Sequence, residues 1–137
     1  MKTGFQGSAL LLVFLFFLAA MPVTAADQSH LLDGKTFSGQ NGEKGHKANR
    51  DDDLIFKNGK FISTSCYDYD FASGDYTATV IGDSIQFKAI TISPEHGKLT
   101  WQGTMKDNKM EASFIWTKER WYWDVRREYW FKGVLKP

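Results

Sequence analysis

The alternation of apolar and polar residues is clearest from Lys98 to Thr117, where the sequence reads KLTWQGTMKDNKMEASFIWT. A two-residue turn at Asp107-Asn108 places four apolar or small pairs on one face, because side chains of a strand point alternately to opposite faces. These pairs are Met105 with Met110, Gly103 with Ala112, Trp101 with Phe114, and Leu99 with Trp116. A slip of one residue would move them all to the other face, so the pattern fixes the register of this predicted hairpin.

Two more hairpins follow the same logic. Asp52–Thr64 contains Asn58-Gly59, which favours a type I′ turn because both central residues of that turn need a positive φ. This turn places Phe56 opposite Phe61 and Ile55 opposite Ile62. A turn at Gly82-Asp83 places on one face the pairs Val80 with Ile85, Ala78 with Phe87, and Tyr76 with Ala89.

The rest of the chain completes an all-β pattern. Lys35–Gly39 is a predicted first strand, and Gln40–Arg50, which lacks large apolar residues, is expected to be an exposed or disordered loop. Ser93–Gly97 is a predicted turn and Glu128–Leu135 a predicted last strand. About eight short strands joined by local connections favour a single antiparallel up-and-down barrel. A two-sheet sandwich is the alternative.

Residues 1–26 resemble a signal peptide. Lys2 precedes the apolar run Ala9–Ala20, which is shorter than the ~20 apolar residues of a membrane span. Pro22 ends the run, and small residues follow at Val23–Ala26. We expect cleavage, export to the periplasm or beyond, and a mature domain 27–137 with no stable membrane anchor; an uncleaved anchor is the alternative.

Charge and chemistry-bearing residues narrow the function. Lys2 is the only charge before residue 27, so removing it from 17 basic residues leaves 16 against 16 acidic ones. This balance argues against nucleic acid as a partner. Asp51–Asp53 is expected to guard the start of a strand and to keep an edge soluble.

The cysteine and histidine content gives no sign of catalysis. Cys66, the only cysteine, cannot form an intramolecular disulfide and is expected to be a buried small side chain rather than a reactive or bridging thiol. The histidines at 30, 46 and 96 fall in predicted loops without metal-ligand spacing. No nucleophile motif is present, so we expect a protein that is not an enzyme and needs no cofactor or metal.

The segment Arg120–Trp130, RWYWDVRREYW, concentrates aromatic and basic residues and is expected to be a long turn. Its rings either plug one end of the barrel or form a recognition surface, since Trp, Tyr and Arg dominate interface hot spots. The predicted interaction surface consists of Ser73, Trp121, Trp123, Arg126 and Trp130.

The order of elements resembles the calycin group, which includes lipocalins, fatty-acid-binding proteins and avidins. Gly34-Lys35-Thr36-Phe37 is similar to the Gly-x-Trp strand that opens lipocalins, with Phe for Trp and one residue more. Arg126 or Arg127 is the counterpart of the arginine that closes over that strand. The resemblance implies a barrel whose lumen is filled by side chains or holds one small ligand.

A second resemblance is to the small exported barrels that inhibit c-type lysozymes. Ser73-Gly74-Asp75-Tyr76 is similar to their Ser-Gly-x-x-Tyr loop, one residue short, and Lys88 follows downstream. The resemblance implies a module that binds another exported protein.

The sequence therefore predicts an exported binding module for a small apolar or amphipathic ligand. The rings expected to converge on the ligand are Tyr76, Phe87, Trp101, Phe114 and Trp116. The alternative is a protein-interaction or inhibitor module, whose partner would be another exported protein.

Overall fold

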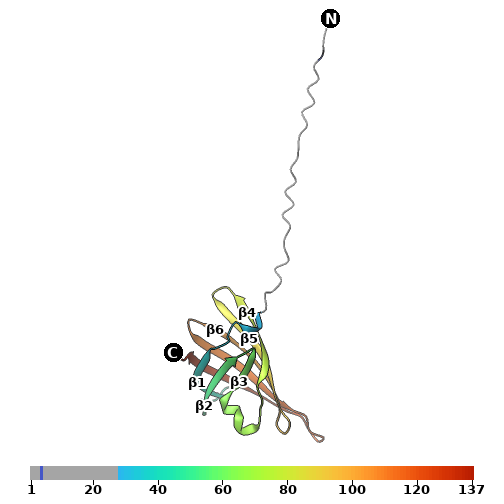
Figure 1. Ribbon diagram of the computed structural model, residues 1–137. Coiled ribbons are helices and arrows are strands. Elements are labelled where there is room, and N and C mark those ends of the chain that lie inside the picture. The colour runs from blue at the N-terminus through green and yellow to red at the C-terminus, as the bar shows by residue number, and fades with distance from the viewer. Residues whose placement is uncertain (1–3, 5–27) are drawn as a thin grey trace.

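The structure, a computed structural model, describes residue 4 and residues 28–137. The predicted signal peptide and its cleavage point lie outside the described residues, apart from residue 4. The described part is a closed barrel in which eight antiparallel strands follow one another in sequence order and the last pairs with the first (Figure 1). The predicted up-and-down barrel is confirmed, and the sandwich is not.

Eight strands and two short 3-10 helices make up this barrel. The strands are β1 (Thr36–Glu43), β2 (Arg50–Lys57), β3 (Lys60–Ser63), β4 (Gly74–Ile81), β5 (Ser84–Ser93), β6 (Gly97–Lys106), β7 (Lys109–Lys118) and β8 (Val125–Leu135), and the helices are η1 (Gln28–His30) and η2 (Thr64–Tyr69). Among the described residues, no helix is both long and apolar enough to span a bilayer.

The three predicted hairpins are confirmed in turn position and register. Asn58 and Gly59 both have positive φ, at 51° and 72°, as a type I′ turn requires. Asp107 and Asn108 adopt the same conformation, at 52° and 60°. Because each turn fixes its own register, the apolar face of each hairpin can be derived from local sequence.

The first strand is longer than predicted. β1 continues to Glu43, so the expected loop Gln40–Arg50 shrinks to residues 44–49. Asn41, which was expected in that loop, is a buried residue of β1. The Asn41 side chain is hydrogen-bonded inside the barrel. Because this inward-facing residue is polar, a pattern of apolar residues does not predict the second half of the strand. β2 is flanked by β1 and β3, so the expectation that Asp51–Asp53 guards a strand edge is wrong.

A continuous chain of aromatic rings fills the middle of the barrel. The centroids of Phe56 and Phe87 lie 5.0 Å apart, and Phe61 connects Phe87 to Trp101 at 5.3 and 5.0 Å. Trp101 then stacks on Phe114 at 4.0 Å. All five side chains are buried, so the centre of the lumen is a packed core.

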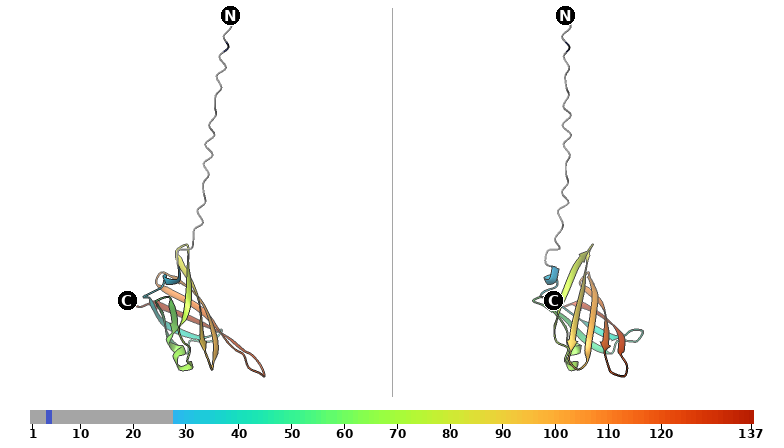
Figure 2. Two further views of the ribbon diagram at one scale, coloured as in Figure 1. Left: turned by 45° about the vertical axis from the view of Figure 1, so that its right-hand side comes forward. Right: turned by 90° about the vertical axis from the view of Figure 1, so that its right-hand side faces the viewer.

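The two ends of the barrel differ. η1 and the three hairpin turns at 58–59, 82–83 and 107–108 lie at one end. η2, the loop 44–49, the turn 94–96 and the loop 119–124 lie at the other, and Figure 2 shows the loop between β7 and β8, in orange-red, projecting beyond the strands. We call this second end the mouth of the barrel.

Candidate functional site

The mouth of the barrel contains a pocket of about 400 Å³. Residues from five strands, from η2 and from the connections at this end surround it. They are Asn41, Glu43, Asn49, Arg50, Ser65, Cys66, Tyr69, Phe71, His96, Leu99, Phe114, Trp116, Arg127 and Tyr129. Its size is within the range of small-molecule sites, which span roughly 300–1,000 Å³.

The floor of the mouth pocket is apolar and continues the aromatic core. Phe114 stacks on Tyr129 with a centroid distance of 4.9 Å and an interplanar angle of 9°. Trp116 follows two residues after Phe114 on the same face of β7, and its Nε1 donates to the carbonyl oxygen of His96 at 2.5 Å. This hydrogen bond holds the indole beside the turn 94–96.

The rim of the mouth pocket is polar, and Arg50 is tied into it. Its Nη2 donates to the hydroxyl of Tyr69, and its guanidinium lies 4.9 Å from the centroid of the same ring. Nη1 reaches the carbonyl oxygen of Ser65 at 3.5 Å. The hydrogen bond with Tyr69 raises the pKa of Arg50, so this guanidinium is charged but already has partners within the protein.

Arg127 brings a second guanidinium to the pocket. It pairs with Trp116 across the β7–β8 ladder and therefore projects to the same inner face. Among residues 28–137 it has no ion pair and no hydrogen bond to its side chain. Its neighbour Arg126, by contrast, pairs with Glu128 at 2.8 Å.

A buried carboxylate supports the wall beside η2. Asp52 is 3% exposed and accepts hydrogen bonds from Asn41 Nδ2 at 2.9 Å, from Ser63 Oγ at 2.7 Å and from the backbone N–H of Ser65 at 3.0 Å. Asn41 also donates to Ser65 Oγ at 3.0 Å. These contacts join β1, β2, β3 and the start of η2, so they hold the wall of the mouth pocket in place.

Cys66 lies on this wall and is 8% exposed, which confirms the prediction that it is buried. Burial raises the pKa of its thiol, with smaller opposing effects from hydrogen bonds to Ser63 and Ser65. A raised pKa keeps the sulfur protonated at neutral pH and therefore a poor nucleophile.

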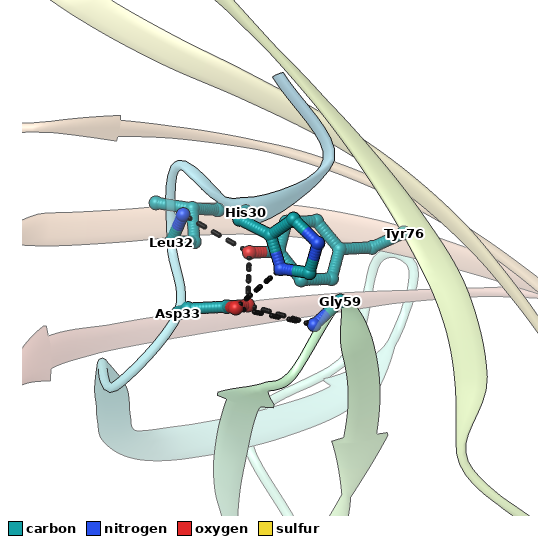
Figure 3. Close-up of polar contacts among 5 residues, drawn as sticks. All are labelled: His30, Leu32, Asp33, Gly59 and Tyr76. Atoms are coloured by element: carbon teal, nitrogen blue, oxygen red, sulfur yellow. Dashed lines mark hydrogen bonds and ion pairs between the residues drawn. The ribbon is translucent and has the colours of Figure 1, made fainter. Parts of the chain in front are cut away.

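The opposite end of the barrel is closed by hydrogen bonds around Tyr76 (Figure 3). The Tyr76 hydroxyl donates to Asp33 Oδ1 at 2.7 Å and accepts from the backbone N–H of Leu32 at 3.1 Å. Asp33 also accepts from Gly59 N–H at 3.0 Å and contacts His30 Nδ1 at 2.6 Å. This cluster fastens η1 across the barrel end and leaves the mouth as the open end.

A larger hollow of about 720 Å³ lies on the outer face of β4–β8. Outward-facing Thr, Gln, Lys and Glu side chains form most of it, and Gly103 also lines it. Phe87 and Phe131 contribute to its floor although their rings are only 1% and 0% exposed. We assign the candidate site to the mouth because the rings of Phe114, Trp116 and Tyr129 form its floor and charged groups surround them, whereas polar side chains form most of the outer hollow.

The five rings predicted to bind a ligand are brought together only in part. Tyr76, Phe87 and Trp101 are each 1% exposed and belong to the core below the pocket. Phe114 and Trp116 line the mouth pocket.

The predicted interaction residues are also divided. Ser73 lies exposed before β4, at the same end as Trp121 and Trp123, whose side chains are 95% and 63% exposed. These exposures show that the expectation of an aromatic plug is wrong for the loop 119–124. Trp130 is half-buried, and its Nε1 donates to the carbonyl oxygen of His46 at 3.1 Å.

Several residues that line the mouth pocket or support its wall were not selected by sequence reasoning. Asn41, Arg50 and Asp52 lie at alternate positions facing the lumen, in segments that carry few apolar residues. The alternation of inward and outward positions continues through these residues. Extending it from the apolar residues of each strand to the polar ones would have placed all three on the inner face. In the described part of the chain, no group of three or more His, Cys, Asp or Glu is arranged to hold a metal ion.

Comparison with known proteins places the chain in no established group: no family model, no curated protein and no solved structure matches it. The fold is consistent with that of the calycin group, and the likeness is one of architecture.

Proposed function

We propose that this protein is an exported binding module that takes one small amphipathic ligand at the mouth of its barrel. The observation that carries the proposal is the combination of an aromatic floor with charged and amide side chains around one 400 Å³ volume. Small-molecule sites commonly combine an apolar lining with a few polar groups that orient the ligand. Export rests on the signal-like residues 1–26.

The packed centre of the barrel defines how a ligand would bind. Trp101 and Phe87 are buried in ring contacts, so a ligand does not thread the lumen but rests on Phe114, Trp116 and Tyr129. A site of this depth suits a compact molecule with one apolar side better than a long alkyl chain.

Fluorescence titration of the mature protein with N-phenyl-naphthylamine, a neutral apolar probe, tests the site. We expect saturable one-to-one binding with energy transfer from tryptophan, because Trp116 forms part of the floor. Asn49→Trp places a ring at the mouth and should abolish binding. His46→Trp is the matched control, since it adds the same ring to the same loop but outside the pocket lining.

Two outcomes would contradict the proposal: no saturable binding, or equal binding by Asn49→Trp and the native protein. If the probe binds as expected, mass spectrometry of protein purified from its native compartment should identify a ligand that occupies the wild-type mouth and is missing from Asn49→Trp.

A second candidate function is protein recognition through the loop 119–124. The specific observation is the exposure of Trp121 and Trp123, which are large rings that monomeric proteins rarely leave in water together. The resemblance to lysozyme inhibitors suggests a c-type lysozyme as the first partner to test. Tyr76, however, is 1% exposed, so the Ser73–Tyr76 segment does not offer its ring to a partner.

An inhibition assay with purified c-type lysozyme tests this candidate. If the loop is the recognition surface, inhibition by the native protein should be lost in Trp121→Ser/Trp123→Ser and kept in Asn49→Trp. Absence of inhibition by the native protein would remove the lysozyme as partner.

A further inference from the structure

The charged residues that line the mouth pocket, Glu43, Arg50 and Arg127, occupy strand positions that face inward. On β8, the alternation that buries Phe131 and packs Tyr129 on the core also places Arg127 inside the mouth. On β1 and β2 the same alternation brings Glu43 and Arg50 to the pocket. The side chains of Arg50 and Arg127 are exposed and that of Glu43 is half-buried, so the partners that each has within the protein decide which of them can receive a ligand.

The partners of these three groups are unequal. Arg50 uses Nη1 and Nη2 on Ser65 and Tyr69. Glu43 and Arg127 both line the pocket, yet no ion pair joins them among the described residues.

The buried carboxylate beside the pocket does not compete for a guanidinium. Asp52 is 3% exposed, does not line the pocket, and is surrounded by donors from Asn41, Ser63 and Ser65. The Arg127 guanidinium is therefore a cation at the mouth whose donors remain available, and it lies directly opposite Trp116 in the ladder.

We propose that the ligand of the mouth pocket is an amphipathic anion, with a flat or compact apolar body on Trp116 and Tyr129 and a carboxylate, sulfonate or phosphate group on Arg127. This inference rests on the proposed function and adds the charge of the ligand to it. Guanidinium groups bind such oxyanions through paired N–H donors, and these charge-assisted hydrogen bonds are stronger than neutral ones. Glu43, on the opposite side of the seam between β1 and β8, disfavours a second negative charge on the ligand.

Two fluorescent probes that differ by one anionic group test the proposal. Anilinonaphthalene sulfonate and N-phenyl-naphthylamine share the same rings, but only the first carries a sulfonate. We expect the native protein to bind the sulfonate about tenfold more tightly, an effect typical of one charge-assisted hydrogen bond. Added salt should weaken binding of the sulfonate and leave binding of the neutral probe unchanged.

Two single substitutions locate the effect. Arg127→Gln should weaken binding of the sulfonate about tenfold and change binding of the neutral probe less than about twofold. Arg126→Gln is the matched control: it is adjacent and exposed and pairs with Glu128, and it should leave both affinities unchanged. Glu43→Gln should tighten binding of the sulfonate, because it removes the one carboxylate of the pocket lining.

The outcomes separate the two proposals. Equal affinities for both probes, or equal loss of sulfonate binding in Arg127→Gln and Arg126→Gln, would overturn the inference about charge and leave the binding module intact. Failure of both probes to bind the native protein would overturn both. Thermal melting of each variant shows whether a loss of binding is a loss of fold; among residues 28–137, the Arg127 side chain has no ion pair or hydrogen bond whose loss would destabilise the barrel.

Discussion

Gly103 leaves the space that a ring of the neighbouring strand occupies. A Cβ at this position would lie 2.5 Å from Phe87 Cε1 and 2.8 Å from Ala112 Cβ. Gly103→Leu should therefore destabilise the protein by about 1–3 kcal/mol, the usual cost of overpacking a core. Urea denaturation measures the change, with the exposed Gln102→Leu on the other face of β6 as control. Equal urea midpoints of unfolding for the two variants would contradict the assignment of Gly103 to the inner face of β6.

Asp33 gives the stability of the barrel a dependence on acid. The hydrogen bond from Tyr76 lowers the pKa of Asp33, with further lowering by Gly59 and His30, against a smaller opposing effect of desolvation. A carboxyl group whose pKa is lower in the folded than in the unfolded protein stabilises the fold at pH values above its unfolded-state pKa. This contribution is lost as the pH falls through the folded-state pKa. Asp33→Asn should therefore lower the melting temperature at neutral pH.

The difference in melting temperature between native protein and Asp33→Asn should shrink between about pH 5 and about pH 2, around the unfolded pKa of ~3.9. Asp75→Asn is a suitable control, because that carboxylate is exposed and pairs only with Lys60 at the surface. A constant difference across this pH range would contradict the role of the Asp33 carboxylate.

At the scale of single residues, the sequence predicts apolar partners well and polar ones poorly. The facing of Gly103 and Ala112 follows from one turn and is confirmed. Asn41 and Asp52 interact across two strands and with η2, and hydrophobic periodicity carries no information on which polar groups satisfy one another inside. The mouth pocket depends on these polar groups, which is why only Phe114 and Trp116 of its floor were selected in advance.

At the scale of elements, η2 depends on one carboxylate. Asp52 accepts from Ser65 N–H and Ser63 Oγ, at the point where β3 gives way to η2. Asp52→Asn replaces one acceptor oxygen by an N–H donor that faces other donors. Leaving such buried donors unpaired should cost about 1–3 kcal/mol.

The reaction rate of the Cys66 thiol measures whether Asp52→Asn loosens η2. Cys66 is 8% exposed within η2, so it should react slowly with a disulfide reagent in the native protein and faster in the variant. Asp51→Asn, whose side chain is exposed on the outer face of β2, should leave the rate unchanged. Equal rates in Asp52→Asn and the native protein would show that η2 does not depend on this carboxylate.

The length of the connections also separates predictable elements from unpredictable ones. Three two-residue turns fix three hairpins, because their positive φ values demand Gly, Asn or Asp. The segments 44–49, 64–73 and 119–124 have no comparable local rule, and all three lie at the mouth. The strands supply the floor and the inward charges of the candidate site, whereas Asn49, Ser65, Cys66, Tyr69 and Phe71 of its wall come from parts of the chain whose conformation depends on tertiary contacts.

At the scale of the whole molecule, closure of the barrel depends on the close approach of β1 and β8. Gly39 pairs with Gly133, and a Cβ at Gly39 would lie 1.9 Å from the Lys132 carbonyl oxygen and 2.5 Å from Gly133 Cα. Both nearby atoms belong to the backbone, so the clash cannot be relieved by a side-chain rotation. Any larger residue at this position must push the two strands apart.

Gly39→Ala should therefore lower the free energy of unfolding by about 3 kcal/mol, at the upper end of overpacking costs. The opening should be local, because β5, β6 and β7 form their ladders without the seam. Hydrogen exchange should accelerate more for amides of β1 and β8 than for those of β5 and β6. Gln40→Ala, at the adjacent exposed position, should change neither measurement by more than about 0.5 kcal/mol. Uniform acceleration over all strands would mean that the barrel unfolds as one unit and has no separate seam.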